Sequence, residues 1–246
     1  MLNKIIELGI SKREAEELIK VSKNIKEDYK KLKNNYPIQY LIGYVNFYGN
    51  KIYVNDSVLI PRYETEYLVE KTIKLCKNKF DYKINVLDLC TGSGAIGISL
   101  KKEINCNVTM SDISKSALSV SKKNIIENNV DVNIVESDLF KNIKGKFDVI
   151  ISNPPYINKK MKLMPTVFDY EPHLALFAED EGLYYYKKIF EQIISYLNDK
   201  FILAFEIGYE QKDKLNKLAV KHFKNCLIRF EKDLNGKYRY LFIISE

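Results

Sequence analysis

Short apolar runs alternate with amphipathic stretches through most of the chain. The run Val149-Ile150-Ile151 is β-branched and has no helical period, which is typical of a strand covered on both faces. From residue 84 to about residue 209, such runs alternate with stretches of helical spacing, and this order predicts an α/β fold with a doubly wound, mostly parallel sheet. The predicted strands are 84–89, 107–110, 132–135, 147–152 and 201–205, and the predicted helices are 94–102, 115–127 and 183–197.

The last apolar runs follow a different order. Runs 227–231 and 238–244 flank Asn235-Gly236, and this dipeptide between two such runs is the strongest short hairpin signal. We therefore expect the sheet to end in an antiparallel hairpin.

The region before the α/β pattern is helical first and extended afterwards. Ser11 and Glu14 form a capping box, which predicts a helix that begins at residue 12. Pro37 ends the helical region, and residues 45–54 predict a β-hairpin around Gly49-Asn50. The chain thus divides into residues 1–35, a short helical segment, residues 36–60, a linker that contains the hairpin, and residues 61–246, the α/β domain.

Composition narrows the class of protein. Hydrophobic residues make up 46% of the 246 residues, enough for a sizeable core, and no apolar stretch is long enough to span a bilayer. The four cysteines, at positions 76, 90, 106 and 226, lack metal-ligand spacing, so we expect no metal site and a reducing, cytoplasmic environment. A net charge of +7 permits an acidic partner such as RNA or an acidic protein, although a general bias toward lysine is the simpler explanation.

The strand predicted at 147–152 stops in an abrupt turn, Asn153-Pro154-Pro155-Tyr156. The two prolines cannot donate hydrogen bonds to a neighbouring strand, so the strand must end at Asn153. Ligands bind at the carboxyl ends of strands in open α/β sheets, and an amide, two rigid rings and a phenol therefore indicate a site. The alternative is a plain Pro-Pro turn with an incidental Asn and Tyr.

A second motif follows the strand at 84–89. Gly92, Gly94 and Gly97 fit the dinucleotide-binding fingerprint, and Asp112 lies 20 residues beyond Gly92, where a ribose-binding acid belongs. Asp88 argues against NAD, because a carboxylate beside a pyrophosphate is costly. The same carboxylate favours a cationic ligand, and S-adenosylmethionine carries both a sulfonium and an ammonium group.

Two further positions complete this cofactor prediction. Asp138 would lie near the exocyclic amine of the adenine and Leu139 against its face, while Asp112 would bind the ribose hydroxyls. A glycine turn without any ligand is the alternative, and the coincidence of three glycines with two placed acids argues against it.

The two motifs end strands that are neighbours in a doubly wound order, so we expect them to share one crevice. The Asn153 side-chain oxygen and the Pro154 carbonyl could accept both N–H groups of a planar nitrogen and stabilise the positive charge that develops on it. Tyr156 would stack on the flat group. No general base is required, because a protonated, N-methylated amide loses its proton to water. The combination predicts methyl transfer to a conjugated nitrogen.

With these motifs, the chain resembles the release factor glutamine methyltransferase family, which methylates the side-chain amide of a glutamine in peptide-chain release factors. Asn-Pro-Pro-Tyr is shared with adenine-N6 and other amino methyltransferases, but its combination with Pro61-Arg62 and Glu171-Pro172 is far more specific. The resemblance runs from about residue 36 to the C-terminus. Its matching stretches are 37–43, 59–62, 64–66, 86–89, 91–94, 137–140, 153–157, 170–172, 175–176, 182–183, 233–234 and residue 236.

This resemblance implies a seven-stranded class I methyltransferase sheet and S-adenosylmethionine as the cofactor. The candidate cofactor contacts are Asp88, Cys90, Thr91, Gly92, Ser93, Gly94, Asp112, Asp138, Leu139 and Asn153. The candidate catalytic and substrate-binding residues are Asn153, Pro154, Pro155 and Tyr156, with Arg62 and Glu64 as further substrate contacts.

The chain departs from the family pattern at several positions. Tyr63 replaces a usual proline, Thr166 stands where the family often has Glu, and Phe177-Ala178 replaces a usual pair of small residues. Members usually have a longer helical N-terminal domain, whereas about 34 residues precede Tyr36 here. We expect residues 1–35 to act as a short segment for docking the substrate.

Two other functions are possible on sequence grounds. An adenine-N6 nucleic-acid methyltransferase would need a target-recognition region and a base-flipping pocket, and the chain has no spare block of that size. A non-catalytic dinucleotide-binding module would leave residues 153–156 unexplained. We therefore predict a monomeric protein-glutamine methyltransferase that acts on a release factor, with no membrane and no direct nucleic-acid partner.

Overall fold

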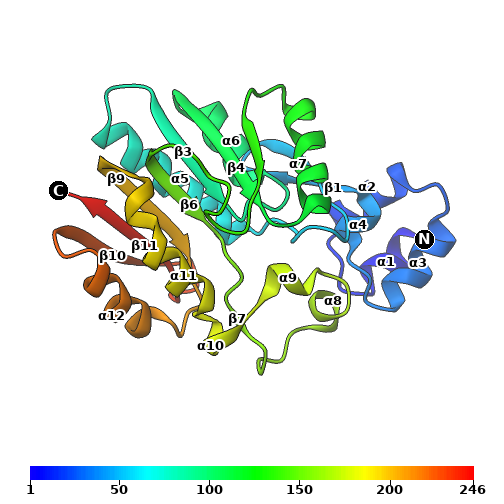
Figure 1. Cartoon of the computed structure of the whole chain (residues 1–246). Coiled ribbons are helices and arrows are strands. Elements are labelled where there is room, and N and C mark those ends of the chain that lie inside the picture. The colour runs from blue at the N-terminus through cyan, green and yellow to red at the C-terminus, as the bar shows by residue number, and fades with distance from the viewer.

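The computed structural model describes residues 1–246, and a seven-stranded sheet forms its centre (Figure 1). Its strands are β3 (Ile84–Leu89), β4 (Cys106–Asp112), β5 (Asn133–Glu136), β6 (Phe147–Ser152), β9 (Leu197–Glu206), β10 (Cys226–Lys232) and β11 (Tyr238–Ser245). They lie in the order β10-β11-β9-β6-β3-β4-β5, and only β11 pairs antiparallel with its two neighbours. The predicted mostly parallel sheet with an antiparallel hairpin at its end is confirmed.

Helices cover both faces of this sheet. The first face packs against α5 (Tyr63–Lys79), α6 (Ala95–Glu103) and α7 (Lys115–Asn128), and the second against α11 (Tyr184–Gln192), the 3₁₀ helix η1 (Ile193–Tyr196) and α12 (Lys212–His222). Successive strand residues point to opposite faces, so Val149 and Ile151 join the first core and Ile150 the second. All three side chains are fully buried, as the unbroken apolar run predicted.

The predicted N-terminal hairpin forms with its loop shifted by one residue. Strands β1 (Tyr44–Phe47) and β2 (Asn50–Tyr53) pair antiparallel, with Phe47 opposite Asn50. Tyr48 and Gly49 therefore make the two-residue loop, and both have the positive φ that a type I′ turn requires. Asn50 belongs to the strand, where its side chain is buried and donates to Ser99 Oγ.

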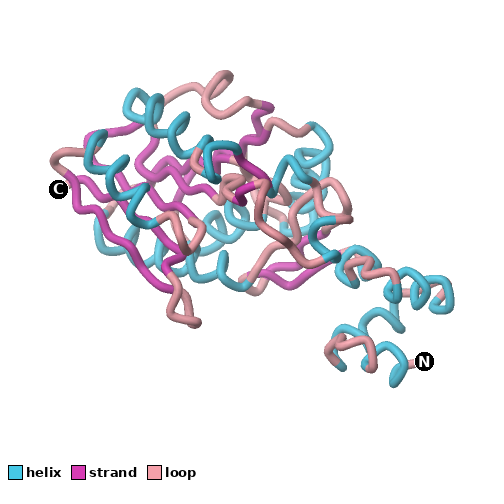
Figure 2. Tube along the Cα trace, turned by 90° about the horizontal axis from the view of Figure 1, so that it is seen from below, coloured by secondary structure: helices cyan, strands magenta, loops and turns pink.

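Four helices precede this hairpin and extend away from the sheet, as Figure 2 shows. They are α1 (Leu2–Ile6), α2 (Lys12–Val21), α3 (Ile25–Lys33) and α4 (Ile38–Ile42). Half of the predicted capping box forms, since Ser11 Oγ accepts from the Glu14 N–H and α2 begins at Lys12. The Glu14 carboxylate accepts from the Ser11 hydroxyl and not from the Ser11 backbone N–H. The prediction that Pro37 ends the helical region is wrong, because α4 follows it. Pro37 takes the N-cap position of α4, where its missing N–H costs no intrahelical bond. No helix of the structure is long and apolar enough to cross a membrane.

The chain makes an excursion between β6 and α11. It forms β7 (Ile157–Asn158), α8 (Pro165–Phe168), α9 (His173–Leu176), β8 (Phe177–Ala178) and α10 (Glu179–Gly182), and β7 pairs with β8. In Figure 1, α8 and α9 lie between the sheet and the N-terminal helices. The Tyr170 hydroxyl donates to Asn34 O at 2.7 Å, and the rings of Tyr36 and Tyr170 meet edge to face. This excursion therefore connects the N-terminal helices to the carboxyl end of β6.

Candidate active site

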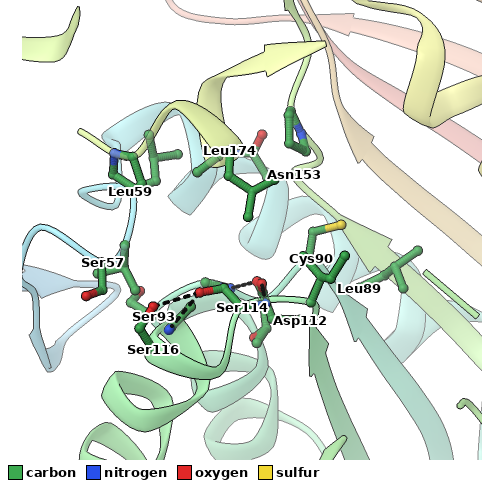
Figure 3. A pocket seen from close by; sticks show the side chains of 18 of the residues that line it. Ser57, Leu59, Leu89, Cys90, Ser93, Asp112, Ser114, Ser116, Asn153 and Leu174 are labelled. Carbon is green, nitrogen blue, oxygen red and sulfur yellow. Dashed lines mark hydrogen bonds between the residues drawn. The ribbon is translucent and has the colours of Figure 1, made fainter. Parts of the chain in front are cut away.

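A cavity of about 400 Å³ opens at the carboxyl ends of β3, β4, β5 and β6. Asn153 and Leu174 lie on one side of it and Asp112 and Ser93 on the other (Figure 3). The glycine motif and the Asn-Pro-Pro-Tyr turn therefore border one cavity. Its walls come from residues 56–59, 61, 65, 89–93, 95–96, 112–114, 116–117, 137–139, 153, 155, 172, 174–175 and 185.

The three glycines of the motif after β3 have different structural roles. A Cβ on Gly92 would meet nothing within 4 Å, and this residue lines the cavity with a φ of 55°. A Cβ on Gly94 would lie 2.5 Å from Met110 Cε, and one on Gly97 would lie 2.7 Å from Met110 Cγ. Gly94 and Gly97 thus let α6 pack closely against β4, and neither lines the cavity.

Side chains from α7 hold the glycine turn in place. Ser121 Oγ donates to Gly92 O at 2.6 Å, and Asn124 Nδ2 donates to Ser93 O at 2.8 Å. Both polar side chains are fully buried. Neither residue was predicted as functional, and the available signal was a pair of short polar residues three apart on the apolar face of a predicted helix.

Asp112, at the end of β4, lies where the ribose was expected. Its Oδ2 accepts from the Gly92 N–H and its Oδ1 from the Ser114 N–H, both at 2.9 Å. Burial raises the pKa of this carboxyl above its ordinary value, although the two N–H groups oppose that shift. Asp112 lines the cavity, and each of its oxygens has a further lone pair with which to accept a ligand hydroxyl.

Asp88 lies behind the turn and does not line the cavity. It is fully buried, and its Oδ2 accepts from Thr91 Oγ1 at 2.5 Å and from the Gly97 N–H at 2.9 Å. Its Oδ1 has no hydrogen-bond partner. Burial raises the pKa of Asp88 to about 7. The structure therefore gives Asp88 a supporting place beneath the turn and leaves one of its oxygens unsatisfied.

The turn after β5 brings Asp138 and Leu139 to the cavity, as the adenine prediction requires. Leu139 has a φ of 48°, in the left-handed region, and Ser137 Oγ holds this turn by donating to Leu139 O at 2.6 Å. Tyr185 of α11 also lines the cavity, and no local sequence motif predicts this position.

The residues of the Asn-Pro-Pro-Tyr turn divide between the cavity and the protein interior. Asn153 and Pro155 line the cavity, whereas Pro154 and Tyr156 do not. The Tyr156 hydroxyl donates to Glu206 Oε1 at 3.1 Å, and burial raises its pKa above the ordinary value. Tyr156 thus braces the turn in this structure, where stacking on a substrate was expected of it.

Arg62 and Glu64 do not line the cavity either. Arg62 forms an ion pair with Glu171, whose side chain is only 1% exposed, and Glu171 Oε2 also accepts from the Ile60 N–H at 3.1 Å. Glu64 lies in the first turn of α5, where the helix dipole favours a carboxylate. The Arg62–Glu171 pair thereby joins the segment before α5 to the segment that contributes Pro172 to the cavity.

Comparison with known proteins decides among the functions that this geometry permits. The chain is 40% identical over 222 residues to the release factor glutamine methyltransferase of Lactococcus lactis subsp. lactis (strain IL1403), a match that covers 89% of this chain and 81% of that protein. The corresponding protein of Streptococcus pneumoniae (strain ATCC BAA-255 / R6) is 39% identical, with 89% and 78% covered. The chain belongs to the release factor glutamine methyltransferase family. The predicted resemblance is confirmed.

Broader comparisons agree with this family membership. Residues 66–169 match the methyltransferase small domain family. A methyltransferase from Pyrococcus furiosus has a similar fold, with a TM-score of 0.60, 20% identity, and coverage of 80% of this chain and 89% of that one. The 16S rRNA N2 G1207 methyltransferase of Thermus thermophilus gives a TM-score of 0.59 at 15% identity, with 82% and 50% covered. The predicted class I methyltransferase fold is confirmed.

The buried Asp88 carboxyl makes the stability of this protein depend on pH. Its pKa is about 7 in the folded chain and about 3.9 in an unfolded one, so the folded state binds the proton more tightly. The contribution of protonated Asp88 to the free energy of unfolding is therefore fully present below about pH 4 and is lost as the pH rises toward 7. Asp88→Asn removes this titration and keeps an acceptor for Thr91 and Gly97. Between pH 5 and pH 8 the wild type should lose at least about 1 kcal/mol relative to the variant.

Urea unfolding of both proteins at several pH values measures this difference. Asp112 titrates in both, so its contribution cancels to first order. A difference in unfolding free energy that stays constant from pH 5 to pH 8 would contradict the raised pKa.

Proposed function

We propose that this chain transfers the methyl group of S-adenosylmethionine to the side-chain amide nitrogen, N5, of a glutamine in a peptide-chain release factor. The observation that carries the proposal is the position of Asn153, on the cavity wall across from Asp112 and the glycine turn (Figure 3), in a member of this methyltransferase family. The carboxamide has an acceptor oxygen where a substrate amide would approach the cofactor.

The residues around the cavity suit the parts of S-adenosylmethionine. Asp112 would accept the ribose hydroxyls, Asp138 the exocyclic amine of the adenine, and Leu139 would cover the ring. Cys90, Thr91, Gly92 and Ser93 would border the methionine portion. The unsatisfied Oδ1 of Asp88 adds negative potential behind the turn, which favours a ligand with a sulfonium and an ammonium group. When bound, S-adenosylmethionine supplies an electrophilic methyl group.

An amide nitrogen is a poor nucleophile, because its lone pair is delocalised into the carbonyl group. Pro154 does not itself line the cavity, but it lies in the turn between Asn153 and Pro155, which do. Asn153 Oδ1 and the Pro154 carbonyl would each accept one N–H of the glutamine amide and hold its nitrogen in line with the methyl group. Both oxygens carry partial negative charge, so their interaction strengthens as positive charge develops on that nitrogen. The methylated nitrogen then loses its proton to water, and no side chain needs to act as a base.

Labelled S-adenosylmethionine tests the proposed substrate directly. The protein is incubated with a release factor, with the same release factor carrying Gln→Ala at the acceptor position, and with a DNA or RNA oligonucleotide. Label should enter only the unmodified release factor. Label in the oligonucleotide and none in the release factor would replace the proposal with a nucleic-acid methyltransferase.

We place the enzyme in the reducing cytoplasm as a monomer. Cys76, Cys90, Cys106 and Cys226 form no disulfide, which suits a reducing compartment. Light scattering of the purified protein measures its mass in solution, and a stable dimer would contradict the proposed monomeric state.

We infer that the N-terminal helices dock the release factor. Residues 36–60 would form the linker and residues 61–246 the catalytic domain. These helices have a small apolar core of their own and touch the cavity-bordering excursion through Tyr36 and Tyr170. Deleting residues 1–33 should raise the KM for a release factor more than it lowers kcat, because it removes binding that does not change in the transition state. A truncated protein with native circular dichroism and unchanged kcat/KM would exclude this role.

Removing the Asp112 carboxylate should weaken cofactor binding. A lost pair of charge-assisted hydrogen bonds costs roughly 1.5–3 kcal/mol, so Asp112→Ala should raise the Kd for S-adenosylmethionine about 10- to 100-fold in calorimetric titration. Asp131→Ala removes an exposed carboxylate away from the cavity and serves as the control. Equal affinity in the two variants would remove Asp112 from the cofactor site.

Asn153→Ala should abolish most methyl transfer and leave cofactor binding nearly intact. Loss of one preorganised group that stabilises transition-state charge typically lowers the rate on the order of 10²–10³-fold. Asn153→Asp keeps an acceptor oxygen but lacks the N–H that reaches Thr65, so we expect it to be impaired as well. Single-turnover rates on a release factor measure both effects, and near wild-type transfer by the Ala variant would exclude Asn153 from the chemistry.

A further inference from the structure

A buried carboxylate lies behind the Asn-Pro-Pro-Tyr turn, and the proposed chemistry does not use it. Glu206 ends β9 and is 3% exposed, and Thr65 of α5 is 5% exposed. Thr65 Oγ1 donates to Glu206 Oε2 at 2.6 Å, while Asn153 Nδ2 reaches the same Thr65 oxygen at 3.4 Å. Three residues from three separate elements thus form one hydrogen-bonded series that ends at the cavity.

The direction of each hydrogen bond in this series follows from the groups involved. An ionised carboxylate can only accept, so Glu206 takes the single hydroxyl hydrogen of Thr65. The Thr65 oxygen then has only lone pairs to offer to Asn153. Asn153 must therefore turn its NH₂ group toward Thr65, and its Oδ1, which has no partner within the protein, is the end left for a ligand.

The two ends of a side-chain amide have nearly the same shape, so their hydrogen-bond partners decide which end faces a ligand. A flipped Asn153 would present N–H groups to the N–H groups of a substrate amide, and two donors would face each other. The correct orientation is therefore a condition for binding and charge stabilisation at the acceptor nitrogen.

We propose that Glu206 and Thr65 are positioning residues that fix the Asn153 carboxamide with its oxygen toward the methyl-accepting amide. This assignment rests on the proposed function, because it concerns how the same site receives a carboxamide. Neither residue lies in the glycine or Asn-Pro-Pro-Tyr motif, and Glu206 does not line the cavity.

The surroundings of Glu206 support its acceptor role. Burial raises its pKa, while the hydrogen bonds from Thr65 and Tyr156 and the positive charge of Arg239 favour the ionised form. The Tyr156 hydroxyl donates to the other carboxylate oxygen, so each oxygen of Glu206 accepts one hydrogen bond. Each of the two carboxylate oxygens thus accepts from a hydroxyl group, and this arrangement directs the Thr65 hydrogen toward Glu206.

Substitutions at Thr65 separate positioning from general support of the fold. Thr65→Val keeps the shape and removes the hydroxyl, whereas Thr65→Ser keeps the hydroxyl. Thr65→Val should lower kcat about 10- to 100-fold and leave the Kd for S-adenosylmethionine within about threefold of wild type. Thr65→Ser should retain kcat within about threefold. If Thr65→Val does not fold, Thr65→Ala takes its place.

Tyr186→Phe provides a matched control for lost stability. The buried Tyr186 hydroxyl donates to the backbone oxygen of Glu206 at 2.6 Å, so this change removes one buried hydrogen bond beside the series and leaves the series intact. We expect a drop in Tm comparable to that of Thr65→Val but an unchanged kcat. Equal losses of kcat in Tyr186→Phe and Thr65→Val would overturn the positioning role.

A double-mutant cycle with Asn153→Ala shows whether Thr65 acts through Asn153. In the Asn153→Ala background, Thr65→Val should add little to the loss of single-turnover rate, because the amide it orients is gone. Fully additive losses would show that Thr65 acts independently and would overturn the proposal. Wild-type kcat in Thr65→Val, with the wild type active on a release factor, would refute the positioning role alone. A wild type that fails to methylate any release factor would refute the proposed function together with it.

Discussion

The parallel pairing of β3 with β6 is the constraint on which the site depends. In this register Leu89 lies opposite Ser152, and Ser152 Oγ donates to Leu89 O at 2.6 Å. Cys90 and Asn153, the next residues after the two strands, therefore leave the sheet side by side at its carboxyl end and border one cavity. A shift of one residue in either strand would move every side chain into the opposite core, which is packed differently, so the close packing of the two cores holds the register that aligns the two motifs.

Three buried carboxylates support the cavity from outside its walls. Asp88 accepts two hydrogen bonds beneath the glycine turn, Glu171 accepts from Arg62 and the Ile60 N–H, and Glu206 accepts from Thr65 and Tyr156. Each is at most 3% exposed. Burying an ionised carboxylate is costly unless donors surround it, so each of these groups holds its donors, and the segments that carry them, in a defined place. Of the three, only Asp88 was predicted from the sequence to contact a ligand, and in the fold it supports the glycine turn from beneath.

The excursion between β6 and α11 is fitted tightly against the Asn-Pro-Pro-Tyr turn. Gly182 has a φ of 85°, and a Cβ there would lie 2.0 Å from Tyr156 O. Gln211 Nε2 donates to the same oxygen at 3.0 Å, so the backbone of the turn is held from a second side. The turn is therefore braced at its first residue through Thr65 and at its last through Gly182, Gln211 and Glu206, which leaves little freedom where a substrate amide would bind.

The sequence by itself determined the main strands of the sheet and the chemistry at their ends. Apolar runs without a helical period located β3 and β6 to the residue, and local turn chemistry located the glycine turn, the Asn-Pro-Pro-Tyr turn and the C-terminal hairpin. These signals lie within a few neighbouring residues, so they can be recognised without the fold. Only the tertiary structure decided which motif side chains face the cavity, because their partners are distant in sequence. Arg62 meets Glu171 across 109 positions, and Thr65 meets Glu206 across 141, contacts that no local pattern encodes.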